Sequence, residues 1–168
     1  RRRVGRGDQV DGVQEVLRMR QVKIPITGVD DAVHFLPALS QTGQEKDLAM
    51  WTAQCHELGY KAMAYNNPYV AKDNANAAAD YQYGIDHGYF VKLPNGEPAL
   101  TQFISGKLLT LATIDLTNPG AVTWFQSLLK RTLDLGYDGW MHDFGEYIPR
   151  EAVLFDGRRG DEVHNAFP

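Results

Sequence analysis

Cysteine is almost absent from this sequence, since Cys55 is the one cysteine among 168 residues. A single cysteine excludes a disulfide within the chain, so the fold must be held together by its core. Cys55 lies in a helical pattern, where a small buried hydrophobe is its expected role. Long apolar runs are also missing, because none approaches the roughly 18 residues of a membrane span. We therefore expect neither a disulfide scaffold nor a membrane partner.

Basic surface is scarce as well. Lys and Arg total 17 against 21 Asp and Glu, and the resulting net charge of -4 argues against a nucleic-acid partner. The basic residues 1–6 are an exception that we interpret as a solvated end. The chain also lacks a metal-ligand spacing of His, Cys and Asp, a GxSxG serine motif and a phosphate-binding GxxxxGK(S/T) loop. No cofactor and no metal are therefore expected.

What the sequence contains is an alternation of helix and strand patterns, in a chain long enough for one domain with a substantial core. The apolar spacing predicts strands at residues 22–29, 60–65, 89–93, 108–116 and 139–141, and helices at residues 9–20, 44–58 and 119–135. The last helix is expected to begin at an Asn118 cap, to end at Gly136, and to bury a stripe of Val122, Phe125, Leu128, Leu129, Thr132 and Leu133. Such alternation argues for a parallel α/β sheet, either open and doubly wound or closed into a barrel. No GxGxxG fingerprint follows the first strand, so we favour the barrel.

The predicted barrel is incomplete. We expect a partial (β/α)8 TIM barrel, roughly the first four βα units, cut at both ends of the chain. Residues 71–107 interrupt the alternation and are expected to be an insertion over the active face, where functional loops lie. Because half a barrel exposes strand edges, the remainder is expected from the missing chain or from a partner.

Polar residues crowd where the predicted strands end. Asp143 and Glu146 follow the last strand, beside Trp140. Ligands of α/β sheets bind at the carboxyl ends of the strands, so Asp143 is the first candidate for chemistry. The further candidates after earlier strands are Asp30, Asp31, His34 and Asn66.

Four short motifs carry a resemblance to a known family. Residues 139–149, Gly-Trp-Met-His-Asp-Phe-Gly-Glu-Tyr-Ile-Pro, resemble the nucleophile strand of glycoside hydrolase family 31, the retaining α-glucosidase family, and most closely its sulfoquinovosidase-like branch. Residues 114–119, Ile-Asp-Leu-Thr-Asn-Pro, resemble the Asp-Phe-Thr-Asn-Pro that precedes the helix before that strand. Ile24-Pro25 and His164-Asn165 resemble two further family motifs, in the same order along the chain.

The resemblance implies a carbohydrate substrate and a (β/α)8 barrel in which Asp143 is the catalytic nucleophile at the end of the fourth strand. It implies a retaining, α-glucosidase-like glycosidase that needs no cofactor. The family's acid/base aspartate lies further beyond the nucleophile than this chain extends, so the chain alone is expected to be inactive. The alternative is a non-catalytic carbohydrate-binding or scaffold fragment of a glycosidase-like barrel. The Gln-Asp-Trp that the sulfoquinovosidase branch uses near its sulfonate is not recognisable here.

Each supporting candidate keeps a structural alternative. Glu146 is expected to orient its neighbours rather than to catalyse. Trp140 is expected in the core unless it lines the pocket, where its ring could stack on a sugar. Asn66 is either a turn former or a pocket residue. The remaining three, Asp30, Asp31 and His34, could contact sugar hydroxyls, although two adjacent aspartates also suit a turn.

Overall fold

A computed structural model describes residues 17–18, 21, 28–30, 43–105 and 107–167 of the chain. Most of the helix predicted at residues 9–20 and most of the strand predicted at residues 22–29 lie outside these residues.

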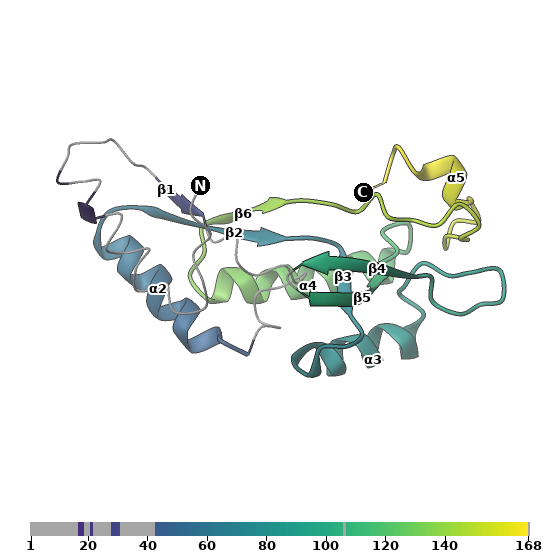
Figure 1. Cartoon of the computed structure of the whole chain (residues 1–168), viewed down its shortest axis with the longest axis horizontal. Helices are drawn as coiled ribbons and strands as arrows, with labels where there is room; N and C mark the ends of the chain where they lie inside the picture. The colour runs from purple at the N-terminus through teal and green to yellow at the C-terminus, as the bar shows by residue number, and fades with distance from the viewer. Residues whose placement is uncertain (1–16, 19–20, 22–27, 31–42, 106, 168) are drawn as a thin grey trace.

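A parallel sheet supports the rest of the described structure. It contains β1 (Gly28–Asp30), β2 (Lys61–Asn66) and β6 (Gly139–His142), in the order β1-β2-β6. Both pairings are parallel. In Figure 1 this sheet crosses the top of the molecule, and the two longest helices lie beneath it. Three parallel strands with helices between them have the α/β plan that the sequence predicts, although the described residues form no closed barrel.

The helix before β2 forms because its apolar residues recur on one face. This helix, α2 (Glu45–Glu57), buries Leu48, Trp51 and Cys55 against the small side chains Ala62 and Ala64 of β2. The spacing of three and four residues between these positions is that of one helical stripe. Its observed bounds agree closely with the predicted helix at residues 44–58, and Cys55 is buried as expected.

The helix before β6 has the predicted caps at both ends. This helix, α4 (Pro119–Asp134), begins after Asn118, whose side-chain oxygen accepts a hydrogen bond from the N–H of Gly120 at 2.9 Å. Pro119 occupies the first helical position, where its missing N–H leaves no bond unmade. Gly136, with a φ of 93°, follows the last turn in the left-handed conformation that suits glycine.

The buried face of α4 differs in part from the predicted stripe. Phe125 and Leu128 are buried as expected, but Leu133 is 44% exposed and Trp124 is buried. The ring of Trp124 meets an aromatic cluster from α3 and the segment after it, with Phe90 edge-on at 5.9 Å. Helical spacing cannot reveal this cluster, because its members come from residues far away in the sequence.

Between β2 and α4, the chain forms a second, antiparallel sheet. It contains β3 (Tyr69–Ala71), β5 (Lys107–Thr113) and β4 (Leu100–Ser105), in the order β3-β5-β4. The 3-10 turn η2 (Ala75–Ala77) and α3 (Ala78–His87) follow β3 and lie below this sheet in Figure 1.

The β-rich run predicted at residues 108–116 is therefore found as β5, but it does not extend the parallel sheet. One residue separates β4 from β5, and so short a connection permits only an antiparallel pair, because a parallel pair needs a crossover of about a dozen residues. The strand β4 is a feature that the sequence analysis missed. The strand predicted at residues 89–93 is reduced to isolated bridges from Phe90 and Lys92.

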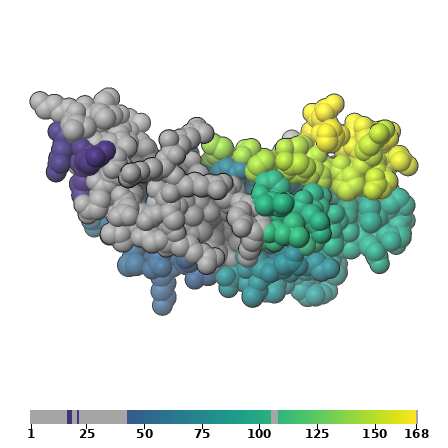
Figure 2. All heavy atoms as spheres, in the orientation of Figure 1, coloured from purple at the N-terminus to yellow at the C-terminus, as the bar shows by residue number. Residues whose placement is uncertain are grey.

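The C-terminal segment folds back onto the region between α3 and β4. It includes the short helix α5 (Gly160–Val163) and forms a separate apolar cluster, whose buried members are Val91, Ala99, Ile148, Ala152, Leu154, Val163 and Phe167. Figure 2 shows this segment in yellow against the teal residues before β4. Within this segment, Gly160 permits a close approach to Pro149, since a Cβ there would lie 1.9 Å from the Pro149 carbonyl oxygen.

Candidate active site

Asp143 lies directly after β6, at the carboxyl end of the parallel sheet. Its backbone N–H donates to the carbonyl oxygen of Asn66 at 3.0 Å, which continues the pairing of β6 with β2 by one residue. Its carboxylate accepts two hydrogen bonds, one from the N–H of Phe144 at 3.0 Å and one from the phenol of Tyr65. Donors on both oxygens fix the direction of the carboxylate.

The alternation of side chains along β6 separates Asp143 from its neighbours. Trp140 packs against the apolar cluster beneath α2. His142 meets the ring of Phe125 in α4 edge-on, with centroids 6.0 Å apart. Both side chains therefore point to the helical side of the sheet, and Asp143 follows on the opposite side. Tyr65, whose backbone pairs with Met141, reaches Asp143 on that opposite side.

His142 does not add a positive charge to the site at neutral pH. Burial lowers the pKa of the His142 imidazole, and the neighbouring Asp143 carboxylate only partly opposes this effect. A lowered pKa favours the neutral ring, which agrees with its packing against Phe125. The imidazole therefore supports the strand from the helical side.

The loop after Asp143 is anchored to the antiparallel sheet. The phenol oxygen of Tyr69 in β3 accepts the N–H of Gly145 at 2.8 Å and the N–H of Tyr147 at 3.3 Å. Thr101 in β4 donates from its hydroxyl to the carbonyl oxygen of Tyr147 at 3.0 Å. Burial raises the pKa of Tyr69 to about 12, so its phenol is neutral at physiological pH.

The structure brings only some of the predicted site residues near Asp143. Asn66 is fully buried and meets Asp143 through its backbone. Glu146 lies half-buried in the loop that Tyr69 anchors. Trp140 contacts the α2 cluster instead of the carboxylate. Asp30 ends β1, and only its backbone is described.

Two of the predicted candidates, Asp31 and His34, lie outside the described residues, so the structure does not place them relative to Asp143.

Sequence reasoning missed the two tyrosines that contact this site, Tyr65 and Tyr69. Tyr65 reads as an ordinary strand residue, and Tyr69 follows the Asn-Asn-Pro turn without any catalytic motif. The two strands after Gly59 and Gly136 begin alike, but aligning those glycines places Tyr65 opposite His142, whereas the sheet pairs Tyr65 with Met141. That register becomes certain only when the sheet is known.

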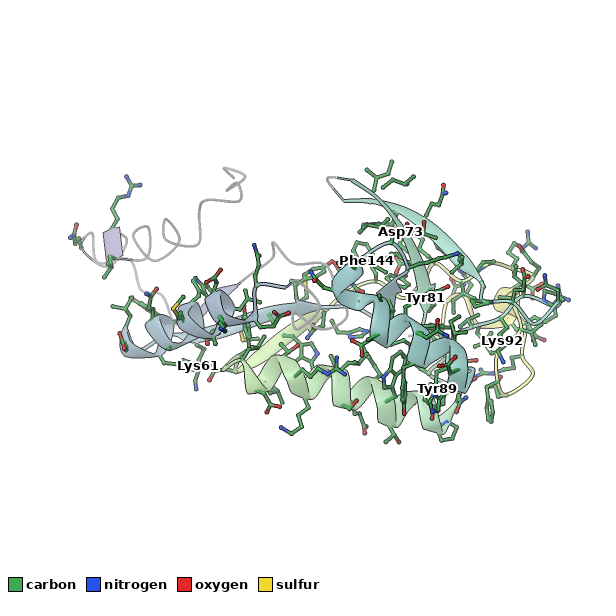
Figure 3. All side chains as sticks on the ribbon, turned by 90° about the horizontal axis from the view of Figure 1, so that it is seen from below. Lys61, Asp73, Tyr81, Tyr89, Lys92 and Phe144 are labelled. Carbon is green, nitrogen blue, oxygen red and sulfur yellow. The ribbon has the colours of Figure 1, made fainter. Side chains whose placement is uncertain are left out.

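One hollow of the described residues lies away from Asp143. It has a volume of about 320 Å³ and includes Lys92, Asp115 and Phe155 in its wall, but not Asp143. Figure 3 shows the labelled Lys92 well apart from Phe144 along the long axis of the molecule. Asp115 is committed to structure there, because its carboxylate accepts the N–H groups of Thr117 and Phe155.

The described residues contain neither a candidate metal site nor a membrane-spanning helix. No group of three or more His, Cys, Asp and Glu side chains among them could hold a metal ion. None of their helices combines the length and the apolar character that crossing a membrane requires.

A parallel strand-and-helix unit that holds a carboxylate at a strand's carboxyl end is the arrangement expected of part of a barrel glycosidase. The family model described as "Glycosyl hydrolases family 31 TIM-barrel domain" matches residues 4–168. The chain therefore belongs to glycoside hydrolase family 31, as the motif around Asp143 predicts.

Curated relatives place the chain near the predicted branch of this family. It is 39% identical over 116 residues to the sulfoquinovosidase of Escherichia coli strain K12, a match that covers 68% of this chain and 16% of that protein. It is 36% identical over 116 residues to the alpha-xylosidase XylQ of Lactiplantibacillus pentosus, covering 67% of this chain and 14% of that protein. The chain thus spans about a sixth of the length of these relatives.

Solved structures agree in fold. A family 31 sulfoquinovosidase from E. rectale, in complex with an aza-sugar inhibitor, matches with 35% identity and a TM-score of 0.61 over 73% of this chain and 18% of that one. The cycloalternan-degrading enzyme of Trueperella pyogenes matches with a TM-score of 0.76 over 95% of this chain and 27% of that one. At 22% identity, the second likeness concerns the fold alone.

Proposed function

We propose that this chain carries the nucleophile of a retaining α-glycosidase and that Asp143 is that nucleophile. The observation that carries the proposal is the position of Asp143 at the carboxyl end of β6, with donors from Phe144 and Tyr65 on its two oxygens. A nucleophilic carboxylate must point in a fixed direction toward the carbon it attacks, and both donors hold it in one direction. Membership of family 31 supports the same assignment.

In the proposed reaction, one oxygen of Asp143 attacks the anomeric carbon of an α-glycoside. The bond from that carbon to the leaving oxygen breaks while a second carboxyl group, about 5–5.5 Å from Asp143, protonates the leaving group. The result is a glycosyl ester on Asp143. The second carboxylate then takes a proton from water, the water oxygen attacks the same carbon, and Asp143 leaves, so the sugar retains its configuration. We assign the second carboxyl to the part of the barrel beyond this chain.

The proposed substrate is an α-glucoside or a closely related α-pyranoside. The relatives named sulfoquinovosidase and alpha-xylosidase support an α-linked, glucose-like sugar ring. The two sugars in these names share such a ring and differ in the substituent on one ring carbon. We further propose that residues 71–107 form a wall of the sugar site. This is supported by the contact of Phe103 with Phe144, whose rings are 5.2 Å apart, and by the Thr101 bond to the loop.

The test replaces Asp143 by alanine in the full-length protein. We expect Asp143→Ala to abolish turnover of aryl α-glucosides, α-xylosides and α-sulfoquinovosides, whichever of them the unaltered protein prefers. Added azide should restore partial turnover and yield the β-configured glycosyl azide, because a small anion can attack where the carboxylate is missing.

The matched control is Asp134→Ala, which removes an exposed aspartate of α4. It should leave turnover unchanged. Substantial activity of Asp143→Ala without azide would remove Asp143 from the nucleophile role.

A further inference from the structure

The residue after the nucleophile has an unusual backbone conformation. Phe144 has a φ of 64°, and it is the one non-glycine residue with a positive φ in the described part of the chain. A bulky side chain rarely adopts this conformation, and it persists only where surrounding contacts impose it. The N–H of Phe144 is also a donor to the Asp143 carboxylate. The direction of the carboxylate is therefore linked to a strained turn.

A single buried oxygen fixes the backbone on the far side of that turn. The phenol oxygen of Tyr69 accepts the N–H groups of Gly145 and Tyr147, which follow Phe144 in the loop. Tyr69 is only 2% exposed and belongs to β3, which is in the other sheet. The oxygen thus holds the loop from an independent and rigid element.

Little room for solvent is found around Tyr69. A cavity of about 10 Å³ is lined by Asn67, Tyr69, Phe103, Leu109, Leu111 and Phe144. Such a volume is at the lower limit for one water molecule. The Phe144 ring closes the cavity and packs edge-on against Phe103. Without the phenol oxygen, the two amides would lose a partner that the protein does not otherwise provide there.

We infer that Tyr69 is a positioning residue for the nucleophile. Its phenol oxygen holds the Gly145 and Tyr147 amides, keeps Phe144 in the left-handed conformation, and so directs the Phe144 N–H onto the Asp143 carboxylate. This role rests on the proposed function of Asp143. A tyrosine that merely filled the core would need its ring but not its oxygen, so the two roles differ in what the hydroxyl does.

The test is Tyr69→Phe in the full-length protein, which keeps the ring and removes the oxygen. We expect kcat for an aryl α-glycoside to fall roughly 10- to 100-fold, because a small displacement of a reacting group costs about that much. KM should change less than the rate does.

The matched control is Tyr81→Phe. Tyr81 lies on α3, where its ring stacks on Phe90 with centroids 5.5 Å apart, away from the Asp143 loop. Removing its hydroxyl should leave kcat and KM unchanged. An unchanged kcat in Tyr69→Phe, or a rise in KM larger than the fall in kcat, would overturn the inference. If Asp143→Ala is inactive in the same assays, the proposed function stands and only the inference on Tyr69 fails.

A second measurement does not depend on whether Tyr69→Phe folds. In the unaltered full-length protein, hydrogen exchange resolved to single residues should show slower exchange for the Gly145 and Tyr147 amides than for the Glu146 amide between them. Equal exchange of all three amides would contradict an anchoring bond from Tyr69.

Discussion

At the scale of the residue, the environment of Asp143 determines its chemistry more than its identity as an aspartate does. A strand-end aspartate is as often a turn residue as a catalyst. Here the phenol of Tyr65, which is 6% exposed, donates to one oxygen, and the Phe144 amide donates to the other. These bonds leave the carboxylate on the face of the sheet that the helices do not cover, which is where the proposed reaction needs it.

Removing the Tyr65 hydroxyl should weaken the proposed reaction without abolishing it. A hydrogen bond to a charged group is worth about 1.5–3 kcal/mol, so Tyr65→Phe should lower kcat/KM roughly 10- to 150-fold. Steady-state kinetics measure this loss, with Tyr81→Phe again as the control. Unaltered kinetics would show that Tyr65 has no part in the chemistry.

At the scale of the element, a polar cluster joins one helix to two strands at the end of the sheet opposite Asp143. Asp138, just before β6, accepts hydrogen bonds from Lys61 Nζ at 2.7 Å, His56 Nε2 at 2.7 Å and the Ala62 N–H at 2.9 Å. In Figure 3, Lys61 lies well apart from Phe144 along the long axis. This cluster therefore holds α2, β2 and β6 together and has no direct part in the proposed reaction.

This cluster predicts a pH-dependent contribution to stability. The ammonium of Lys61, followed by His56 and the Ala62 N–H, holds the pKa of the Asp138 carboxyl well below its usual range. A group whose pKa is lowered by folding stabilises the protein above its unfolded pKa, about 3.9, and loses that effect as the pH falls further. Asp138→Asn should therefore lower Tm at about pH 7, and its difference from the unaltered protein should shrink toward about pH 3.

Thermal unfolding of the full-length protein at a series of pH values measures this difference. The control is Asp134→Asn, whose partner Lys130 lies one turn away on the exposed face of α4, and it should change Tm little. A Tm difference for Asp138→Asn that stays constant down to about pH 3 would rule out the ionic explanation.

At the scale of the whole molecule, the described parallel sheet is open. In the order β1-β2-β6, each outer strand has one partner among the described residues, and Met141 of β6 is 51% exposed. Met141 shares the side of Tyr65 and Asp143. A sugar site on that side needs further walls and a second carboxyl group, and closure of the sheet would also remove its strand edges.

We therefore expect the 168-residue chain by itself to lack turnover of aryl α-glucosides, while the full-length protein hydrolyses them or a related α-glycoside. Parallel assays, together with calorimetric titration of both proteins with the free sugar, measure this. Turnover by the short chain would contradict the need for a second carboxyl beyond it. Sugar binding without turnover in both proteins would favour the non-catalytic carbohydrate-binding alternative.

The local elements could be predicted because short-range spacing encodes them. The stripe of Leu48, Trp51 and Cys55 predicts α2, and the Asn118-Pro119 start predicts α4, since caps and helical faces depend on neighbours in the chain. The motif around Asp143 likewise predicts both the family and the candidate nucleophile. Each of these features needs only a few consecutive residues, so the sequence by itself determined them.

Tertiary structure alone decided which distant residues meet. His56 has no evident partner in the sequence, yet Asp138 lies against it 82 residues later. Tyr65 and Tyr69 look like ordinary strand residues in the sequence. The register of the parallel sheet brings Tyr65 to Asp143, which lies 78 residues later, and the antiparallel sheet brings Tyr69 to Gly145, which lies 76 residues later. The physical reason is that such contacts arise from strand pairing and packing between elements, which local spacing does not record.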